Sequence, residues 1–121
     1  MEKILTIKNN TVFGQVYAKG KSSVQPSIVV YCRKRASLPK AHVGITAGKK
    51  LGGAVERNRA RRIIKEAYRN LVLEGTGIND KPYYYVFVAR KKCFVKKTRM
   101  QDVLSDMRKA LRDLGLLGES L

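Results

Sequence analysis

Residues 49–69 read KKLGGAVERNRARRIIKEAYR, and this stretch carries most of the information about the fold. Its apolar residues recur at spacings of three and four, which predicts a helix that packs one face on a core. Gly52 and Gly53 would weaken a helix interior, so we expect the helix to begin after them, near 55–58. The predicted buried stripe consists of Ala60, Ile63, Ile64, Ala67, Tyr68 and Leu71.

The opposite side of this helix is strongly basic. Residues 49–69 hold eight lysines and arginines against two glutamates. A solvated face stabilised by ion pairs needs both signs interspersed, and two carboxylates cannot balance eight cations. The first turn of a helix also presents unpaired N–H groups and a positive dipole end, which suit a phosphate. We therefore predict a polyanion-binding face with Asn58, Arg62, Lys65 and Arg69 in one row, flanked by Arg59 and Arg61.

The charge of the whole chain points the same way. Its 121 residues include 26 Lys and Arg against 9 Asp and Glu, a net charge of +17. Such an excess is tolerated best beside a polyanion, with nucleic acid the first candidate and an anionic membrane surface the second. No apolar run reaches the roughly 18–20 residues of a spanning helix, and residues 1–8 lack the apolar core of a signal peptide. We expect one cytoplasmic domain over residues 1–121.

Hydrophobic patterning over the rest of the chain predicts an α/β (α+β) sandwich, with helices packed on a single mixed sheet. The expected order is α-β-β-α-β-α, with a short extra strand near 22–24. Thr98 and Gln101 form a capping-box pattern at the start of the last helix. The other predicted elements are a helix from Asn9–Thr11 to Gly20, strands over 27–33, 42–47 and 83–89, and a last helix that Gly115 ends.

The order of residue types in 48–67 resembles the signature of the bacterial ribonuclease P protein subunit. That family carries Lys-Lys-x-Gly-x-Ala-Val-x-Arg-Asn-Arg-x-Lys/Arg-Arg, and the match here is long and in register. The similarity extends outward from this helix and covers about Leu5 to Leu114. The pattern Phe13-x-x-Val16-Tyr17-x-x-Gly20 is similar to the family's first helix. Residues 29–31 and 43–45 are similar to strands of its sheet. The resemblance implies that the basic helix makes a left-handed crossover between parallel strands. Pattern alone predicts the opposite hand, since about 98% of such crossovers are right-handed.

We find no catalytic or metal-binding residues in the sequence. The nine carboxylates are scattered, and His42 fits a surface or core residue better than a general base. Cys32 and Cys93 lack zinc-site spacing and are interpreted as structural. The resemblance accounts for this, because in ribonuclease P the RNA subunit is the catalyst. It also implies that magnesium is required by the RNA-containing holoenzyme, while no cofactor is assigned to the protein.

Two binding surfaces are predicted. The resemblance implies that the basic helix and its leading loop dock near the catalytic core of the RNA subunit, where arginine grips phosphate bidentately. Arg57 leans toward the apolar stripe, so anchoring the loop is an alternative role for it. The segment 90–99 holds six basic residues and either extends this surface or is a solvated loop. The predicted RNA-binding residues are Lys49, Lys50, Arg57, Asn58, Arg59, Arg61, Arg62, Lys65 and Arg69.

The second surface is aromatic. By resemblance, Phe13, Tyr17 and Tyr31 line a cleft that receives the single-stranded 5′ leader of precursor tRNA. Aromatic rings stack with unpaired bases of any identity, worth roughly 1–3 kcal/mol per base. The sequence alone favours an ordinary core position for Phe13 and Tyr17, and the resemblance favours the leader most firmly for Tyr31.

The resulting prediction is the protein subunit of an endonuclease that removes the 5′ leader of precursor tRNA. Its partners would be the ribonuclease P RNA and precursor tRNA, with no membrane and no DNA. The main alternative is a basic ribosomal RNA-binding protein. A double-stranded DNA-binding protein has no helix-turn-helix or heptad pattern to support it, and a protein-only ribonuclease would have to cleave without any RNA subunit.

Overall fold

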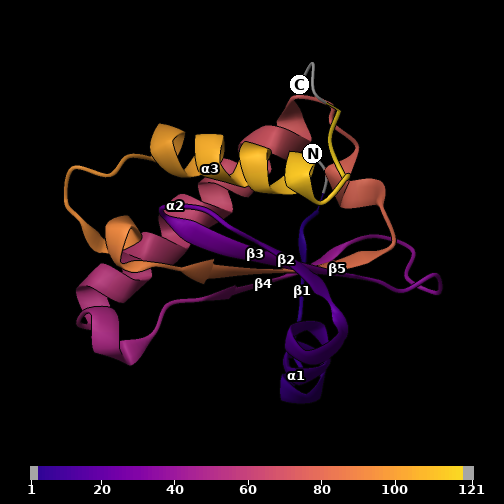
Figure 1. Cartoon of the computed structure of the whole chain (residues 1–121), viewed down its shortest axis with the longest axis horizontal. Coiled ribbons are helices and arrows are strands. Elements are labelled where there is room, and N and C mark those ends of the chain that lie inside the picture. The colour runs from indigo at the N-terminus through magenta and orange to yellow at the C-terminus, as the bar shows by residue number, and fades with distance from the viewer. Residues whose placement is uncertain (1–2, 119–121) are drawn as a thin grey trace.

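The computed structural model describes residues 3–118 as one mixed sheet with helices on both faces. Figure 1 shows helix α1 on one side of the sheet and helices α2 and α3 on the other. The strands are β1 (Leu5–Thr6), β2 (Lys21–Val24), β3 (Ile28–Lys34), β4 (His42–Thr46) and β5 (Tyr83–Ala89). The helices are α1 (Asn10–Lys19), α2 (Ala54–Leu73) and α3 (Met100–Asp113), with short 3-10 turns η1 (Lys49–Leu51), η2 (Ile78–Asp80) and η3 (Lys91–Phe94).

The strand order in the sheet is β1-β4-β5-β3-β2. β4 pairs with β1 and β5 in parallel, while β3 pairs with β5 and β2 in antiparallel fashion. The predicted mixed sheet and the short extra strand are therefore confirmed. Helix α2 connects the parallel neighbours β4 and β5, and the left-handed sense of this crossover stays a prediction from the family resemblance. Strand β1 was not predicted, because two residues are too few to show an alternating pattern.

The main hydrophobic core lies between the sheet and helices α2 and α3. Along β3, Ile28, Val30 and Cys32 are buried in this core. All six residues of the predicted α2 stripe are buried, and α2 begins at Ala54, one residue before the expected range. Full burial of one such Ile or Leu side chain stabilises the fold by about 1.5–3 kcal/mol. This one-sided burial leaves the basic side of α2 facing solvent.

Within residues 3–118, α1 is the helix that covers the second face of the sheet. Asn9 caps this helix, because its side-chain Oδ1 accepts a 2.8 Å hydrogen bond from the Thr11 N–H. Val16 is the buried residue of α1, and Val86 of β5 is also fully buried outside the main core cluster. The apolar character of both faces of β5 is thereby explained.

The predicted capping box at the start of α3 was wrong by one residue. The N-cap is Arg99, whose backbone N–H donates to Asp102 Oδ2 at 2.8 Å. Thr98 is buried instead, and its hydroxyl donates to the Lys92 carbonyl at 2.7 Å. The Thr98–Gln101 pattern gave the wrong N-cap because the Thr98 hydroxyl bonds to the preceding segment and not to the first turn of α3.

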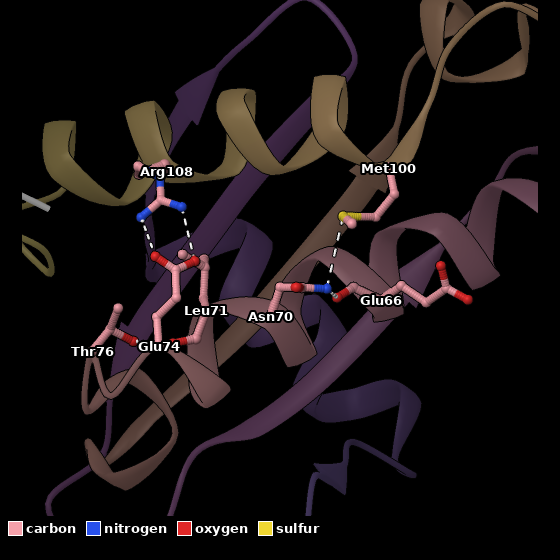
Figure 2. A network of polar contacts seen from close by, with 7 residues as sticks. All are labelled: Glu66, Asn70, Leu71, Glu74, Thr76, Met100 and Arg108. Atoms are coloured by element: carbon pink, nitrogen blue, oxygen red, sulfur yellow. Dashed lines mark hydrogen bonds and ion pairs between the residues drawn. The ribbon is translucent and has the colours of Figure 1, made fainter.

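Polar contacts also connect α2 and α3 (Figure 2). The Arg108 guanidinium donates two 2.9 Å hydrogen bonds to the Glu74 carboxylate. Nearer the start of α3, the Asn70 amide lies 3.8 Å from the Met100 sulfur. From the middle of α3, Asp106 Oδ2 accepts from the Ser27 hydroxyl at 2.6 Å and from its N–H at 2.9 Å. These contacts hold α3 against both α2 and the start of β3.

Candidate nucleic-acid interface

The predicted basic row of α2 is open to solvent. Asn58, Arg62, Lys65 and Arg69 are all exposed on the side of the helix away from the buried stripe. The leading loop is exposed as well, with Lys49 and Lys50 in the turn η1. These side chains can meet a phosphate backbone without any rearrangement of the core.

Two of the predicted RNA-binding arginines make internal contacts with carbonyl groups, and their role in RNA binding stays a prediction. Arg57 is half-buried and donates from Nη1 to the Gly52 carbonyl at 2.9 Å, which supports its alternative role as an anchor of the leading loop. Arg59 donates from Nη2 to the carbonyls of Thr98 at 2.7 Å and Lys96 at 3.1 Å. Both arginines therefore position chain segments around the basic row.

The hydrogen bonds of Arg59 hold the end of the basic segment 90–99 against α2. Cys93 and Thr98 of this segment are buried, so it is held against the protein rather than solvated throughout. Lys96 and Lys97 of this segment lie beside the α2 row, where a hollow of about 650 Å³ has Glu66 as the carboxylate in its lining. The cations that line this hollow are Arg59, Arg62, Lys96, Lys97 and Arg99. The basic surface is therefore wider than α2 itself.

Gly52 joins the leading loop to the same segment. A Cβ atom at this position would lie 2.8 Å from Cδ2 of Phe94, a separation that side chains do not tolerate. The absence of a side chain at Gly52 lets the leading loop pack on the ring of Phe94 in η3. Gly52 thus serves close packing as well as ending η1 before α2 begins.

The aromatic residues gather on the opposite face of the sheet. The rings of Tyr17 and Tyr31 meet edge to face with centroids 4.9 Å apart, and Phe13 lies 6.5 Å from Tyr17. Tyr17 is 42% exposed, and Phe13 and Tyr31 are half-buried. The core position that sequence alone favoured for Tyr17 is therefore wrong, since Val16 takes that place. We call Phe13, Tyr17 and Tyr31 the aromatic surface.

Phe13 owes its position to a glycine on β4. A Cβ atom at Gly44 would come within 2.5 Å of the Phe13 ring, so the ring lies directly on the strand backbone. Phe13 also lines a hollow of about 250 Å³ at the β1–β4 edge, together with Lys65 from the basic row. The two predicted surfaces thus lie on opposite faces and approach each other around this edge of the sheet.

Cys32 and Cys93 are buried, and the His42 ring contacts a backbone carbonyl and an aromatic ring. Burial raises the pKa of the Cys93 thiol to about 11 and also raises the pKa of Cys32. His42 Nδ1 lies 3.1 Å from the Lys40 carbonyl, and its ring packs on Tyr84. Within residues 3–118, no three His, Cys, Asp or Glu side chains gather closely enough to hold a metal ion. In the same part of the chain no helix has the length and apolar character needed to cross a membrane.

Comparisons with known proteins agree with this architecture. A family profile for ribonuclease P matches residues 1–115. The ribonuclease P protein component of Bacillus cereus strain B4264 is 37% identical over 93 residues, which cover 77% of each chain. The structure of the Staphylococcus aureus RNase P protein superposes with a TM-score of 0.78 at 25% identity, covering 96% of this chain and 100% of that one. The RNase P protein from Thermotoga maritima shares the fold, with a TM-score of 0.72 at 24% identity over 86% of this chain and 92% of that one.

Proposed function

The chain belongs to the ribonuclease P protein family, and we propose that it holds two RNAs at once, the catalytic RNA subunit and the leader of a precursor tRNA. It is the protein component of a ribonucleoprotein endoribonuclease. One observation carries the proposal: a basic helix and an aromatic surface lie on opposite faces of the same sheet.

The basic face of α2 is suited to the RNA subunit. Its exposed row of one asparagine and three cations can neutralise backbone phosphates without reading sequence. Arg57 and Arg59 support this surface from within, because each holds a flanking segment through a carbonyl group. Lys96, Lys97 and Arg99 extend the same face beside Arg62. We therefore assign the α2 face, with the segment 96–99, to the RNA subunit.

The aromatic surface is suited to the single-stranded leader. The rings of Tyr17 and Tyr31 meet at the surface, where Tyr17 is 42% exposed and Tyr31 is half-buried. Stacking of unpaired bases on such rings tolerates every base, which a protein that serves many precursor tRNAs requires. Tyr31 also shares its sheet face with Arg33, so a cation lies near the stacked base.

The chemistry of cleavage is assigned to the RNA subunit with its magnesium ions, and the protein's contribution is charge. A net charge of +17 reduces the repulsion between the RNA subunit and precursor tRNA. We expect the protein to lower the magnesium concentration that cleavage requires. This assignment also implies a cytoplasmic location, where tRNA precursors are processed.

Reconstitution tests the proposal. The full chain is mixed with a bacterial ribonuclease P RNA, and cleavage of precursor tRNA is followed at low magnesium. Cleavage should appear with protein and RNA together, and neither should suffice alone under these conditions. Cleavage by rigorously RNA-free protein would refute the proposal, as would failure to stimulate any bacterial ribonuclease P RNA. Co-sedimentation with ribosomal subunits would instead support the ribosomal alternative, which the family match does not favour.

A further inference from the structure

A small hollow of about 350 Å³ lies between the start of α2 and the end of the turn η3. The side chains of both segments line it: Val55, Glu56, Arg59, Phe94 and Lys96. The Phe94 ring is held in place because it packs on the backbone of Gly52, where a Cβ atom would lie 2.8 Å from Cδ2. Pockets for small ligands have volumes of about 300–1,000 Å³. The hollow is therefore of the size that suits one small chemical group.

The apolar part of this hollow is open to solvent. Val55, in the first turn of α2, is 78% exposed, and Val95, which follows Phe94, is 48% exposed. Phe94 itself is half-buried. Single exposed apolar residues are common on protein surfaces, whereas neighbouring ones that surround a hollow mark a site of interaction. We therefore ask which partner this site fits.

The charge around the hollow favours RNA over a second copy of the chain. Arg59 and Lys96 line this hollow and also the larger one on the basic face, so the two are continuous. Lys49 and Lys50 precede the hollow in η1. A second copy would bring its own net charge of +17 against these cations, and the repulsion disfavours it. RNA has the opposite charge, and its unpaired bases stack on aromatic side chains.

Glu56 provides a hydrogen-bond acceptor inside the hollow. Within residues 3–118 its exposed carboxylate forms no ion pair with the cations nearby. A carboxylate repels a phosphate, but it accepts hydrogen bonds from an exocyclic amino group such as N4 of cytosine or N6 of adenine. The hollow itself therefore suits a base, and the phosphates on either side of that base can contact Lys96 and Lys97.

We propose that an unpaired adenine or cytosine of the RNA subunit enters this hollow, stacks on Phe94 beside Val55 and donates its amino group to Glu56. The inference rests on the proposed function, in which the α2 face docks on the RNA subunit. Phosphate contacts position a nucleic acid but carry no sequence information. This base would give a surface that otherwise acts through charge its preference for one site on the RNA.

Tryptophan fluorescence provides the test, because the chain contains no Trp. Phe94→Trp introduces a reporter that keeps an aromatic ring in the hollow. Its emission should be quenched when a bacterial ribonuclease P RNA is added without precursor tRNA, since the base stacks directly on the indole ring. The matched control is Ser105→Trp, at an exposed position of α3 outside the hollow, whose emission should change little.

Affinity for the same RNA provides a second measurement. Phe94→Leu removes the aromatic ring and keeps an apolar side chain against Gly52. It should bind the RNA at least about 5-fold more weakly, the lower limit for one stacked base. An adenine or cytosine that the wild-type protein protects from dimethyl sulfate should become reactive again with this variant.

Unchanged emission of Phe94→Trp in its complex with the RNA would overturn the inference while the proposed function stands. Emission that changes with protein concentration in the absence of RNA would also overturn it, because a second copy would then fill the hollow. If thermal unfolding shows that Phe94→Leu does not fold, the emission of Phe94→Trp decides alone. Failure of the wild type to stimulate cleavage by the RNA would overturn both the inference and the proposed function.

Discussion

The ring of Tyr31 on β3 meets the ring of Tyr17 on α1 edge to face, at 82° and with centroids 4.9 Å apart. Burial of Val16 beneath α1 brings the helix onto the sheet and so makes this contact possible. Edge-to-face pairs are favourable and leave one ring face free for a further partner. The pair is therefore a helix–sheet contact at the place where we propose that a leader base stacks.

Removing the ring of Tyr31 should weaken leader binding selectively. We expect Tyr31→Ala to reduce the affinity of the holoenzyme for precursor tRNA by roughly 1–3 kcal/mol, the value of one base stacked on an aromatic ring. Tyr31→Phe, which keeps the ring, should retain most of the affinity. Mature tRNA lacks the leader and should bind almost as before. Equal losses for precursor and mature tRNA would show that Tyr31 has no role in leader binding.

Removing the charge of Arg62 should impair assembly with the RNA subunit and spare the fold. Arg62 is exposed opposite the buried stripe, so Arg62→Ala should change the free energy of unfolding by no more than about 0.5 kcal/mol. RNA affinity should fall and its salt dependence should become shallower. Arg57→Ala is the contrasting variant, since loss of the bond to Gly52 should cost about 1–2 kcal/mol of stability. Unfolding by Arg62→Ala would contradict the assignment of the exposed face.

Removing the side chain of Arg59 should release the segment 96–99. Its guanidinium holds the carbonyls of Lys96 and Thr98, and no other residue described here bonds these two groups from α2. In Arg59→Ala, amide hydrogen exchange should accelerate in 95–99 and stay slow in β3 and β5. Arg61→Ala, at a neighbouring position whose guanidinium contacts Asn58 instead, serves as the control. Unchanged exchange in 95–99 would show that other contacts hold the segment.

The contact between Glu74 and Arg108 should give a small pH-dependent contribution to stability. The hydrogen bond from Arg108 lowers the pKa of Glu74 below its ordinary value of 4.5. The stabilisation is therefore present above the pKa of the unfolded chain and is lost as the pH falls through the folded pKa. Because the pair is partly exposed, Glu74→Gln should cost at most about 1 kcal/mol near neutral pH. In urea titrations the difference from wild type should shrink toward zero below the ordinary pKa, and a constant difference would contradict the pairing.

The two thiols should be unreactive in the folded protein. Burial raises the pKa of Cys93 to about 11, and the reactive species is the thiolate. A thiol reagent near neutral pH should modify Cys32 and Cys93 only slowly in the native protein and both rapidly after unfolding. Rapid reaction of one thiol under native conditions would show that its part of the core opens.

The local sequence pattern was sufficient to predict those elements in which each residue position is either buried or exposed according to the period of the helix or strand. In α2, the spacing of six apolar residues determined which side is buried and which faces solvent, because a helix has a fixed period. In β3, strict alternation placed Ile28 and Tyr31 on opposite faces for the same reason. Tyr83–Ala89 was predicted with its observed bounds, since a strand covered on both sides is apolar throughout.

Tertiary structure decided everything that depends on contacts between distant segments. Arg57 and Arg59 look alike in the sequence as members of one basic helix, and only the folded chain brings the carbonyls of Gly52 and Thr98 within reach of their guanidinium groups. Likewise, Tyr17 is exposed while its neighbour Val16 is buried, because docking of α1 on the sheet selects one of two adjacent apolar positions. Periodicity assigns a residue to a face, but packing across the chain determines which part of that face is covered and which remains free to bind RNA.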